Sequence, residues 1–123
     1  RAFRSSLDEG IYMETTLRGA SGATYSFTVC GLEQEFDDAL AVYVFAQSAS
    51  TGYEPVYIGR TFHLRSRIAQ HRKEDGKYGC ALKNGADHIL VHYVAPGDIL
   101  VDAEAKMVEK DLIDAYETPC NMK

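Results

Sequence analysis

One short run of apolar residues constrains the fold of this chain more than any other feature. Residues 40–46 read Leu-Ala-Val-Tyr-Val-Phe-Ala. Consecutive side chains point to opposite faces of a strand, so a strand with this sequence is apolar on both faces. Such strands are typical of the covered centre of a sheet. We therefore expect residues 40–46 to form a central strand with structure packed on both sides.

The residues after this run predict a partner strand and a helix. Residues 47–54 are rich in Ser, Thr and Gly, which favours a loop. Residues 55–59 then form a second strand, most simply paired antiparallel with the first. Residues 61–73 have helical character, with Thr61 as the candidate N-cap. Leu64 and Ile68 are four residues apart and define the buried side of this helix.

The rest of the second half predicts three more elements. Residues 78–84 favour a short helix ending at Gly85, and residues 88–94 alternate as a third strand. Pro96-Gly97 is expected to be a turn. Residues 102–116 form the last helix, which stops before the proline at 119.

The first part of the chain predicts a β-hairpin. Residues 10–18 and 23–30 have strand composition and are separated by a Gly-containing turn. The chain of 123 residues has the size of one ordinary domain. We expect an α/β (α+β) fold, with a central three-stranded, mainly antiparallel sheet flanked by helices. Residues 1–39 are expected to be an extension whose hairpin packs on the core, and residues 40–123 to be the functional domain.

The charge balance argues against nucleic acid, but the distribution of charge does not. The formal net charge is −5, from 13 Lys and Arg and 18 Asp and Glu. Between residues 60 and 73, however, there is no acidic residue and the bases gather: Arg60, Arg65, Arg67, Arg72 and Lys73. An acidic protein with one basic stripe can bind a phosphate backbone locally. The alternative is that the stripe is simply a solvated helix face.

The cysteines and the hydropathy pattern suggest an intracellular protein. Cys30, Cys80 and Cys120 are odd in number and widely spaced, so we expect reduced structural thiols. The first ten residues lack the apolar centre of a signal peptide. No apolar run approaches the roughly 20 residues that cross a bilayer, so no membrane association is expected. The cytoplasm or nucleoid, or the nucleus, is the expected location.

One carboxylate of the last predicted helix falls where an acid is not expected. Ala105, Val108, Leu112 and Tyr116 form an apolar stripe, and a helical projection places Glu109 inside it. A carboxylate facing a core is costly unless it is paired, hydrogen-bonded or bound to a metal. A buried ion pair, for instance with Arg67, or a position at the edge of the sheet where the Glu reaches water would be a structural explanation, and a metal ligand is the functional one.

The order of short motifs resembles that of the GIY-YIG nuclease superfamily. Val42-Tyr43-Val44 lies in the first core strand and Tyr57-Ile58-Gly59 in the second. The stretch from Tyr57 onward, YIGRTFHLRSRIAQHR, and the ending EKDLIDAYETPCN are similar to the family's segments, and the likeness spans residues 40–121. Ala41 departs from the family, which has glycine there. Gly10-Ile11-Tyr12 spells the first motif literally but lies too far from Tyr57 to pair with it.

This resemblance implies a role for each matching residue. Glu109 would bind Mg²⁺ (or Mn²⁺), a hard ion that needs only one carboxylate and several waters. Arg67 would hold the scissile phosphate. Tyr43 is favoured as the base that activates water, with Tyr57 as its partner, although the reverse order stays open. His71 would share a proton with a tyrosine or touch phosphate. Asn121 would bind phosphate or order the site, and the remaining bases would contact nucleic acid.

The leading hypothesis is therefore a divalent-metal-dependent endonuclease that hydrolyses phosphodiester bonds in DNA, with RNA left open. Cutting both strands of a duplex would suit a homodimer. One alternative is a non-catalytic nucleic-acid-binding module on the same scaffold. Another is a nuclease domain that acts only with a targeting partner, and the start at Arg1 rather than Met keeps this open.

Overall fold

The protein is an α+β structure in which a five-stranded antiparallel sheet carries helices on both faces. The computed structural model describes residues 13–74, 76–94 and 101–121. The elements, in chain order, are β1 (Met13–Arg18), β2 (Thr24–Gly31), β3 (Ala41–Ala49), β4 (Gly52–Thr61), α1 (Leu64–Glu74), α2 (Gly76–Lys83), β5 (His88–Tyr93) and α3 (Val101–Ala115). Residues 10–12 of the predicted first strand and the predicted Pro96-Gly97 turn lie outside the described residues.

The sheet contains two more strands than the sequence predicted. β3 lies between β4 and β5 and pairs antiparallel with both, as expected for a central strand. The strand order is β1-β2-β5-β3-β4, because β2 pairs antiparallel with the free side of β5. The prediction of a three-stranded sheet with a hairpin packed on it is therefore wrong. Without β2, the main-chain N–H and C=O groups along one side of β5 would lack hydrogen-bond partners. β2 supplies these partners by pairing with β5.

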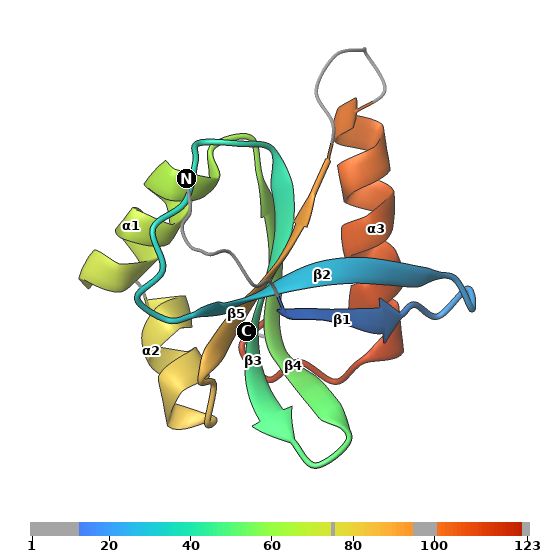
Figure 1. Cartoon of the computed structure of the whole chain (residues 1–123), viewed down its shortest axis with the longest axis horizontal. Helices are drawn as coiled ribbons and strands as arrows, with labels where there is room; N and C mark the ends of the chain where they lie inside the picture. The colour runs from blue at the N-terminus through green and yellow to red at the C-terminus, as the bar shows by residue number, and fades with distance from the viewer. Residues whose placement is uncertain (1–12, 75, 95–100, 122–123) are drawn as a thin grey trace.

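The alternation of side chains along β3 and β4 creates two separate apolar layers. Tyr43 and Tyr57 contribute to the cluster that includes Leu64 of α1 and Ala81 of α2. The residues that follow each tyrosine belong to the other cluster, beneath α3. Figure 1 shows α1 and α2 on one side of the sheet and α3 on the other. Consecutive residues of these strands thus face different helices.

The helix predicted for residues 61–73 begins three residues later, at Leu64. Thr61 Oγ1 accepts a hydrogen bond from the main-chain N of His63, just before the helix, rather than from within its first turn. The cap comes instead from a distant segment, since Asp38 Oδ1 accepts from the main-chain N of Ser66 at 3.1 Å. A carboxylate at a helix N-terminus also interacts favourably with the helix dipole. The bond from Ser66 lowers the pKa of Asp38.

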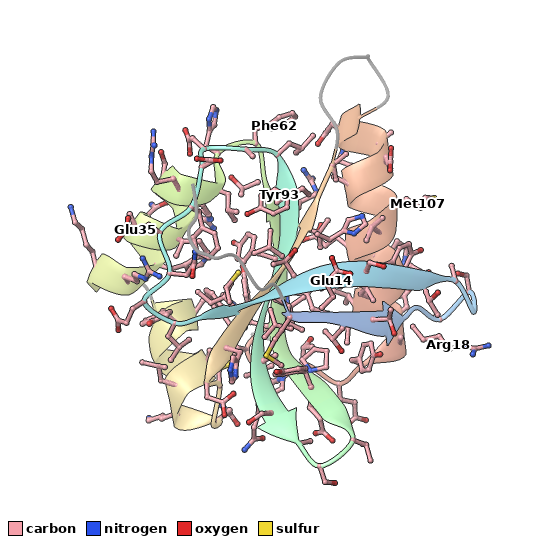
Figure 2. The ribbon with its side chains drawn as sticks, viewed as in Figure 1. Glu14, Arg18, Glu35, Phe62, Tyr93 and Met107 are labelled. Carbon is pink, nitrogen blue, oxygen red and sulfur yellow. A yellow bond between two sulfur atoms is a disulfide. The ribbon has the colours of Figure 1, made fainter. Side chains whose placement is uncertain are left out.

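The two remaining predicted helices are present, α2 as Gly76–Lys83 and α3 as Val101–Ala115, and the predicted buried stripe of the last helix is confirmed. α2 ends just before Gly85, which has a φ of 90° that a side chain would disfavour. On α3, the predicted stripe of Ala105, Val108 and Leu112 is buried against the sheet. Met107 is 58% exposed and points away from the sheet (Figure 2).

The tip of the β1–β2 hairpin is fastened to α3 mainly through Asp111, whose main-chain oxygen also accepts from Ala20 N at 3.0 Å. Asp111 accepts hydrogen bonds from Ser21 N at 2.8 Å, Ser21 Oγ at 2.7 Å and Tyr25 Oη at 2.7 Å. Leu17 and Phe27 of the hairpin pack in the same cluster as Leu112. The described part of the N-terminal segment thus extends the sheet through β2 and packs against α3.

We expect Asp111→Asn to lower Tm by several degrees at pH 7. Hydrogen bonds from Ser21 and Tyr25 lower the pKa of Asp111 in the folded protein. Their stabilising effect is therefore present above the ordinary Asp pKa of about 3.9 and is lost as the pH falls through the lowered folded value. Thermal unfolding between pH 7 and pH 3 should show the gap between variant and wild type narrowing as the pH falls.

The matched control is Asp114→Asn, because Asp114 lies on the same helix and forms only an exposed ion pair with Lys110 at 2.9 Å. Such pairs contribute little to stability. An equal loss of Tm in both variants would contradict the role assigned to Asp111.

Candidate active site

Three of the predicted site residues meet in a buried cluster on the α1 side of the sheet. Tyr43 comes from β3, Tyr57 from β4 and His71 from α1. The hydroxyl of Tyr43 and Nε2 of His71 are 2.8 Å apart and hydrogen-bonded. The ring of Tyr57 lies 6.1 Å from that of Tyr43 and 5.6 Å from that of His71. Residues far apart in the sequence thus form one group.

Arg67 provides the charged end of this cluster. It lies one turn before His71 on α1 and is half-buried, and its Nη1 donates to Gln70 at 2.9 Å. A hydrogen bond to Tyr43 raises the pKa of Arg67, and the charge of a nearby Tyr57 phenolate would act in the same direction. Arg67 therefore places a permanent cation beside the two tyrosines.

Burial determines whether Tyr43 can lose its proton. Both Tyr43 and His71 are only 1% exposed. Burial raises the pKa of Tyr43 well above its ordinary value, and Arg67 opposes this effect only in part. A free phenolate at Tyr43 is therefore strongly disfavoured at neutral pH. The hydroxyl can still receive a proton from one side while it donates to His71 on the other.

Gly59 is required where it stands because Tyr43 lies directly over it. A Cβ added at Gly59 would come within 2.6 Å of both Cζ and Oη of Tyr43. These atoms belong to a buried ring that cannot move aside easily. The glycine of the Tyr57-Ile58-Gly59 motif thus has a packing reason, independent of any resemblance.

Glu109 lies in a second group, on the other side of the sheet. Its side chain is 25% exposed on α3, and its Oε1 accepts from Nε of Arg60 at 3.1 Å. Nη1 of Arg60 also contacts Asp102 Oδ1 at 3.0 Å. Burial raises the pKa of Glu109, and Arg60 opposes that rise. The ion-pair partner suggested from the sequence, Arg67, is wrong, because Arg67 is on α1 and faces the opposite side of β4.

The two groups lie on opposite faces of the sheet and are linked in the chain through consecutive residues of β4. Gly59 faces the tyrosine cluster, and Arg60 faces α3 and Glu109. Their Cα atoms are about 3.8 Å apart, as across any trans peptide. β4 is also the outermost strand of the sheet on this side. A ligand at the β4 edge could therefore meet groups from both faces.

The carboxylate of Glu109 suits a hard divalent cation that takes only one or two ligands from the protein. In the part of the chain that the structure describes, no three His, Cys, Asp or Glu side chains converge as a metal cage. Mg²⁺ does not need such a cage, because it keeps several waters and binds through one or two carboxylates. Glu109 offers the right donor atoms, provided that Arg60 releases the oxygen that it holds.

The other predicted bases have different environments. Arg65 and Lys73 are exposed on α1. Arg72 is not open to a ligand in the same way, because its Nη2 donates to the main-chain oxygens of Leu32 and Gln34. It thereby holds the connection between β2 and β3, and contact with a phosphate would require these bonds to break. The basic stripe is therefore divided between surface charge and structural anchoring.

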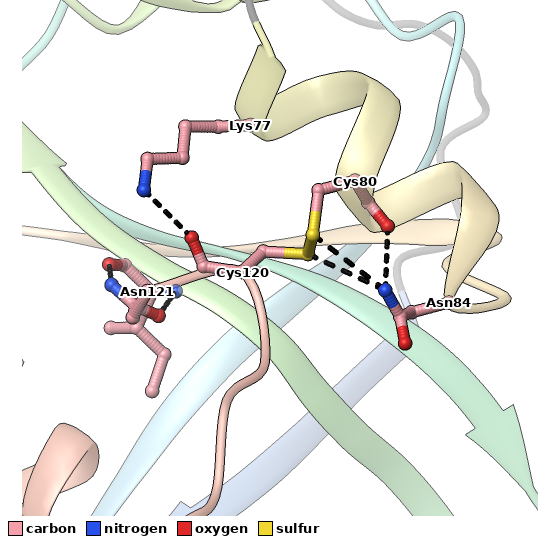
Figure 3. Close-up of a disulfide and its surroundings, with 6 residues drawn as sticks. Lys77, Cys80, Asn84, Cys120 and Asn121 are labelled. Atoms are coloured by element: carbon pink, nitrogen blue, oxygen red, sulfur yellow. Dashed lines mark hydrogen bonds between the residues drawn. A yellow bond between two sulfur atoms is a disulfide. The ribbon is translucent and has the colours of Figure 1, made fainter. Parts of the chain in front are cut away.

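Asn121 orders the edge strand. Its Oδ1 accepts from Ile58 N at 2.8 Å and its Nδ2 donates to Ile58 O at 2.8 Å (Figure 3). The preceding residue, Cys120, donates its main-chain N to Val56 O at 3.2 Å. The C-terminal segment thus runs along β4 and fixes the main chain between Tyr57 and Gly59. Of the two roles predicted for Asn121, ordering the site is the one that this geometry fits.

A disulfide that the sequence did not reveal holds this segment in place. Cys80 of α2 and Cys120 are joined across a sequence separation of 40, with their Cα atoms 5.8 Å apart. Lys77 Nζ also donates to Cys120 O at 2.9 Å (Figure 3). The prediction of three reduced thiols is therefore wrong, because the fold brings two distant cysteines together. Cys30 remains a free, buried thiol whose pKa burial raises to about 11.

The expectation of reduced cysteines was one argument for an intracellular location. The disulfide removes that argument, because such bonds are typical of oxidising compartments. Within the described residues, the structure contains no helix with the length and apolar character needed to cross a membrane. In comparisons with known proteins, no family model matches the chain and no solved structure matches it significantly.

Gly59→Ala is expected to lower the free energy of unfolding by about 1–3 kcal/mol, because the added methyl overpacks a buried ring. Urea denaturation measures this directly. Gly31→Ala is the control, since Gly31 is also a strand glycine but has no heavy atom within 4 Å of an added Cβ. Its effect should stay within about 0.5 kcal/mol. Equal effects at both positions would contradict the close approach of Tyr43 to Gly59.

Reduction of the disulfide should lower the free energy of unfolding by about 2–4 kcal/mol, because the closed loop restricts the unfolded chain. The measurement is urea denaturation of the wild type with and without dithiothreitol. A Cys80→Ala/Cys120→Ala variant should resemble the reduced wild type and should not respond to dithiothreitol. If thiol titration shows full reduction and stability is unchanged, the bond does not contribute as stated.

Proposed function

We propose that the protein is a divalent-metal-dependent endonuclease of the GIY-YIG type that hydrolyses phosphodiester bonds in DNA. The observation that carries the proposal is the convergence of Tyr43, Tyr57, Arg67 and His71, centred on the 2.8 Å contact between Tyr43 and His71. These residues come from three separate elements and are the ones that the motif order singles out. The packing of an apolar core does not require a charged guanidinium beside two phenols.

In this proposal, Arg67 binds the scissile phosphate. Its charge is permanent, and its planar group can donate two parallel hydrogen bonds to phosphate oxygens. Arg67 is half-buried, so the phosphate would lose part of its water on binding. Arg65 and Lys73, which are exposed on the same helix, would contact neighbouring phosphates and position the strand.

The tyrosines and His71 activate the attacking water as a relay. Tyr57 orients the water, and the Tyr43 hydroxyl accepts its proton while donating its own proton to His71 Nε2. This requires the His71 tautomer that carries its proton on Nδ1. The relay avoids a free phenolate, which burial of Tyr43 disfavours. It also assigns a function to His71, whose Nε2 is hydrogen-bonded to the Tyr43 hydroxyl at 2.8 Å.

Glu109 is the proposed ligand for Mg²⁺ or Mn²⁺. When bound, the ion would supply positive charge that stabilises the phosphate and the leaving oxygen. Asn121 fixes Ile58 and so holds the two flanking residues, Tyr57 and Gly59, in position. DNA is the proposed substrate, with RNA as the alternative, and a homodimer would allow both strands to be cut. An intracellular location, in the cytoplasm, nucleoid or nucleus, would follow from that substrate.

A second candidate function is a nucleic-acid-binding module without catalysis. The observation that favours it is the ion pair of Glu109 with Arg60, which occupies the carboxylate that a metal would need. In such a module, the basic groups of α1 would hold nucleic acid and Glu109 would serve only to stabilise the packing of α3.

Cleavage of supercoiled plasmid distinguishes the two functions. We expect the wild type to nick plasmid with Mg²⁺ or Mn²⁺ and not with EDTA. Glu109→Gln and Tyr43→Phe should each lower the rate by about 100-fold or more, because each removes a group that acts on the reacting atoms. Glu104→Gln is the control, since Glu104 is an exposed acid on the same helix and should leave the rate unchanged.

Circular dichroism would establish that each variant is folded. DNA binding by a wild type that does not cut with any metal would favour the binding module. Cleavage that survives Glu109→Gln undiminished would contradict the assignment of Glu109.

A further inference from the structure

We propose that Arg60 is a resident cation that the divalent metal displaces from Glu109, and that the released guanidinium then contacts the phosphate. The inference rests on the proposed nuclease function and assigns to Arg60 a step that precedes catalysis. The ion pair between Arg60 and Glu109 is then the metal-free state of the site. Arg60 first competes with the metal for the Glu109 carboxylate, and after its release it contacts the phosphate of the substrate.

The contacts of Arg60 place its charge where a metal would have to bind. Nε of Arg60 is 3.1 Å from Oε1 of Glu109, and Nη1 is 3.0 Å from Oδ1 of Asp102. Asp102 and Glu109 lie seven residues apart on α3, which is about two helical turns and the same face. One guanidinium therefore bridges two carboxylates. A second cation at Glu109 would be repelled as long as Arg60 stayed in contact.

The exposure of these groups makes an exchange feasible. The side chains of Arg60, Asp102 and Glu109 are 29%, 39% and 25% exposed, so water can reach the ion pair. Ion pairs of this kind are held weakly compared with fully buried ones. Asp102 can keep its contact with Nη1 when Nε leaves Glu109. Arg60 would then remain attached near the site instead of swinging into solvent.

The position of Arg60 in the chain connects its release to the tyrosine cluster. It follows Gly59 directly, and the Tyr43 hydroxyl lies against Gly59. The main chain here is fixed, because Asn121 holds the main chain of Ile58 on the preceding side. A guanidinium released at this position stays on the α3 side of β4, next to Glu109, and would contact the phosphate that the metal at Glu109 holds. Binding of the metal would thus supply a second phosphate contact.

The test is Mn²⁺ binding, measured by electron paramagnetic resonance at pH 7 and constant ionic strength, without nucleic acid. We expect Arg60→Gln to bind Mn²⁺ with a Kd about five-fold lower than that of the wild type, because the competing cation is gone. Glu109→Gln should abolish saturable binding. Arg60→Lys keeps the charge and should bind more like the wild type, and it serves as a second variant if Arg60→Gln folds poorly.

Lys110→Gln is the matched control for charge. Lys110 is adjacent to Glu109 in sequence, but it is 77% exposed and pairs with Asp114 instead. The Lys110→Gln substitution removes one positive charge from the helix turn that carries Glu109 and leaves the contacts of Glu109 intact. The Mn²⁺ affinity of this variant should therefore stay close to that of the wild type. Tightening in Lys110→Gln equal to that in Arg60→Gln would overturn the proposal, because the effect would then be a general one of net charge.

Plasmid cleavage provides the second readout. Arg60→Gln should cut plasmid at least about ten-fold more slowly than the wild type, although it binds Mn²⁺ more tightly. Opposite changes in metal affinity and cleavage rate are expected if Arg60 leaves Glu109 when the metal binds and then contacts the phosphate. Unchanged or weaker Mn²⁺ binding in Arg60→Gln, with normal binding by the wild type, would overturn this inference and leave the nuclease proposal standing. No saturable Mn²⁺ binding by either protein would overturn both.

Discussion

The double burial of β3 is the constraint on which the other parts of the structure depend. From Ala41 to Ala46 every side chain is at most 1% exposed, so each one is committed to a single face of the sheet. Because alternate residues face α1 and α3, a shift of one residue in register would exchange the two layers. The pairing of Tyr43 with Gly59 fixes that register on the β4 side. The hydrogen bond from Tyr43 to His71 is possible only in this arrangement.

β4 carries the polar chemistry because it is covered less completely than β3. As the outermost strand on its side of the sheet, it presents Tyr57 to one face and Arg60 to the other, near the border with solvent. Charged side chains are tolerated at such a border and not in the centre. One residue of each polar group, Tyr57 and Arg60, therefore lies on this strand. The arrangement requires no loop to carry the chemistry, and both groups rest on regular secondary structure.

The sequence predicted best what depends on local periodicity. The central strand, its partner, the end of α2 at Gly85 and the buried stripe of α3 all follow from side-chain spacing, and the structure confirms them. The motif order also singled out Tyr43, Tyr57 and His71, and these side chains lie together in the structure. What failed depends on the partner across space. A helical projection shows that Glu109 faces the sheet, but it does not show whether the cation opposite belongs to β4 or to α1. The pairing of β2 with β5 and the bond between Cys80 and Cys120 were missed for the same reason, since neither is encoded in short-range spacing.

The C-terminal segment changes what the sheet can do at its β4 edge. An outer strand ordinarily offers unpaired N–H and C=O groups to which another extended chain can add itself. Here the amide of Asn121 satisfies both main-chain groups of Ile58, and Cys120 satisfies the carbonyl of Val56, so a side chain and a turn take the place of a neighbouring strand. A peptide cannot add as a further strand at these residues. A partner that approaches the edge at Val56 and Ile58 has to be recognised through side chains, and the discrimination between partners there depends on charge and shape instead of on the backbone pattern that all proteins share.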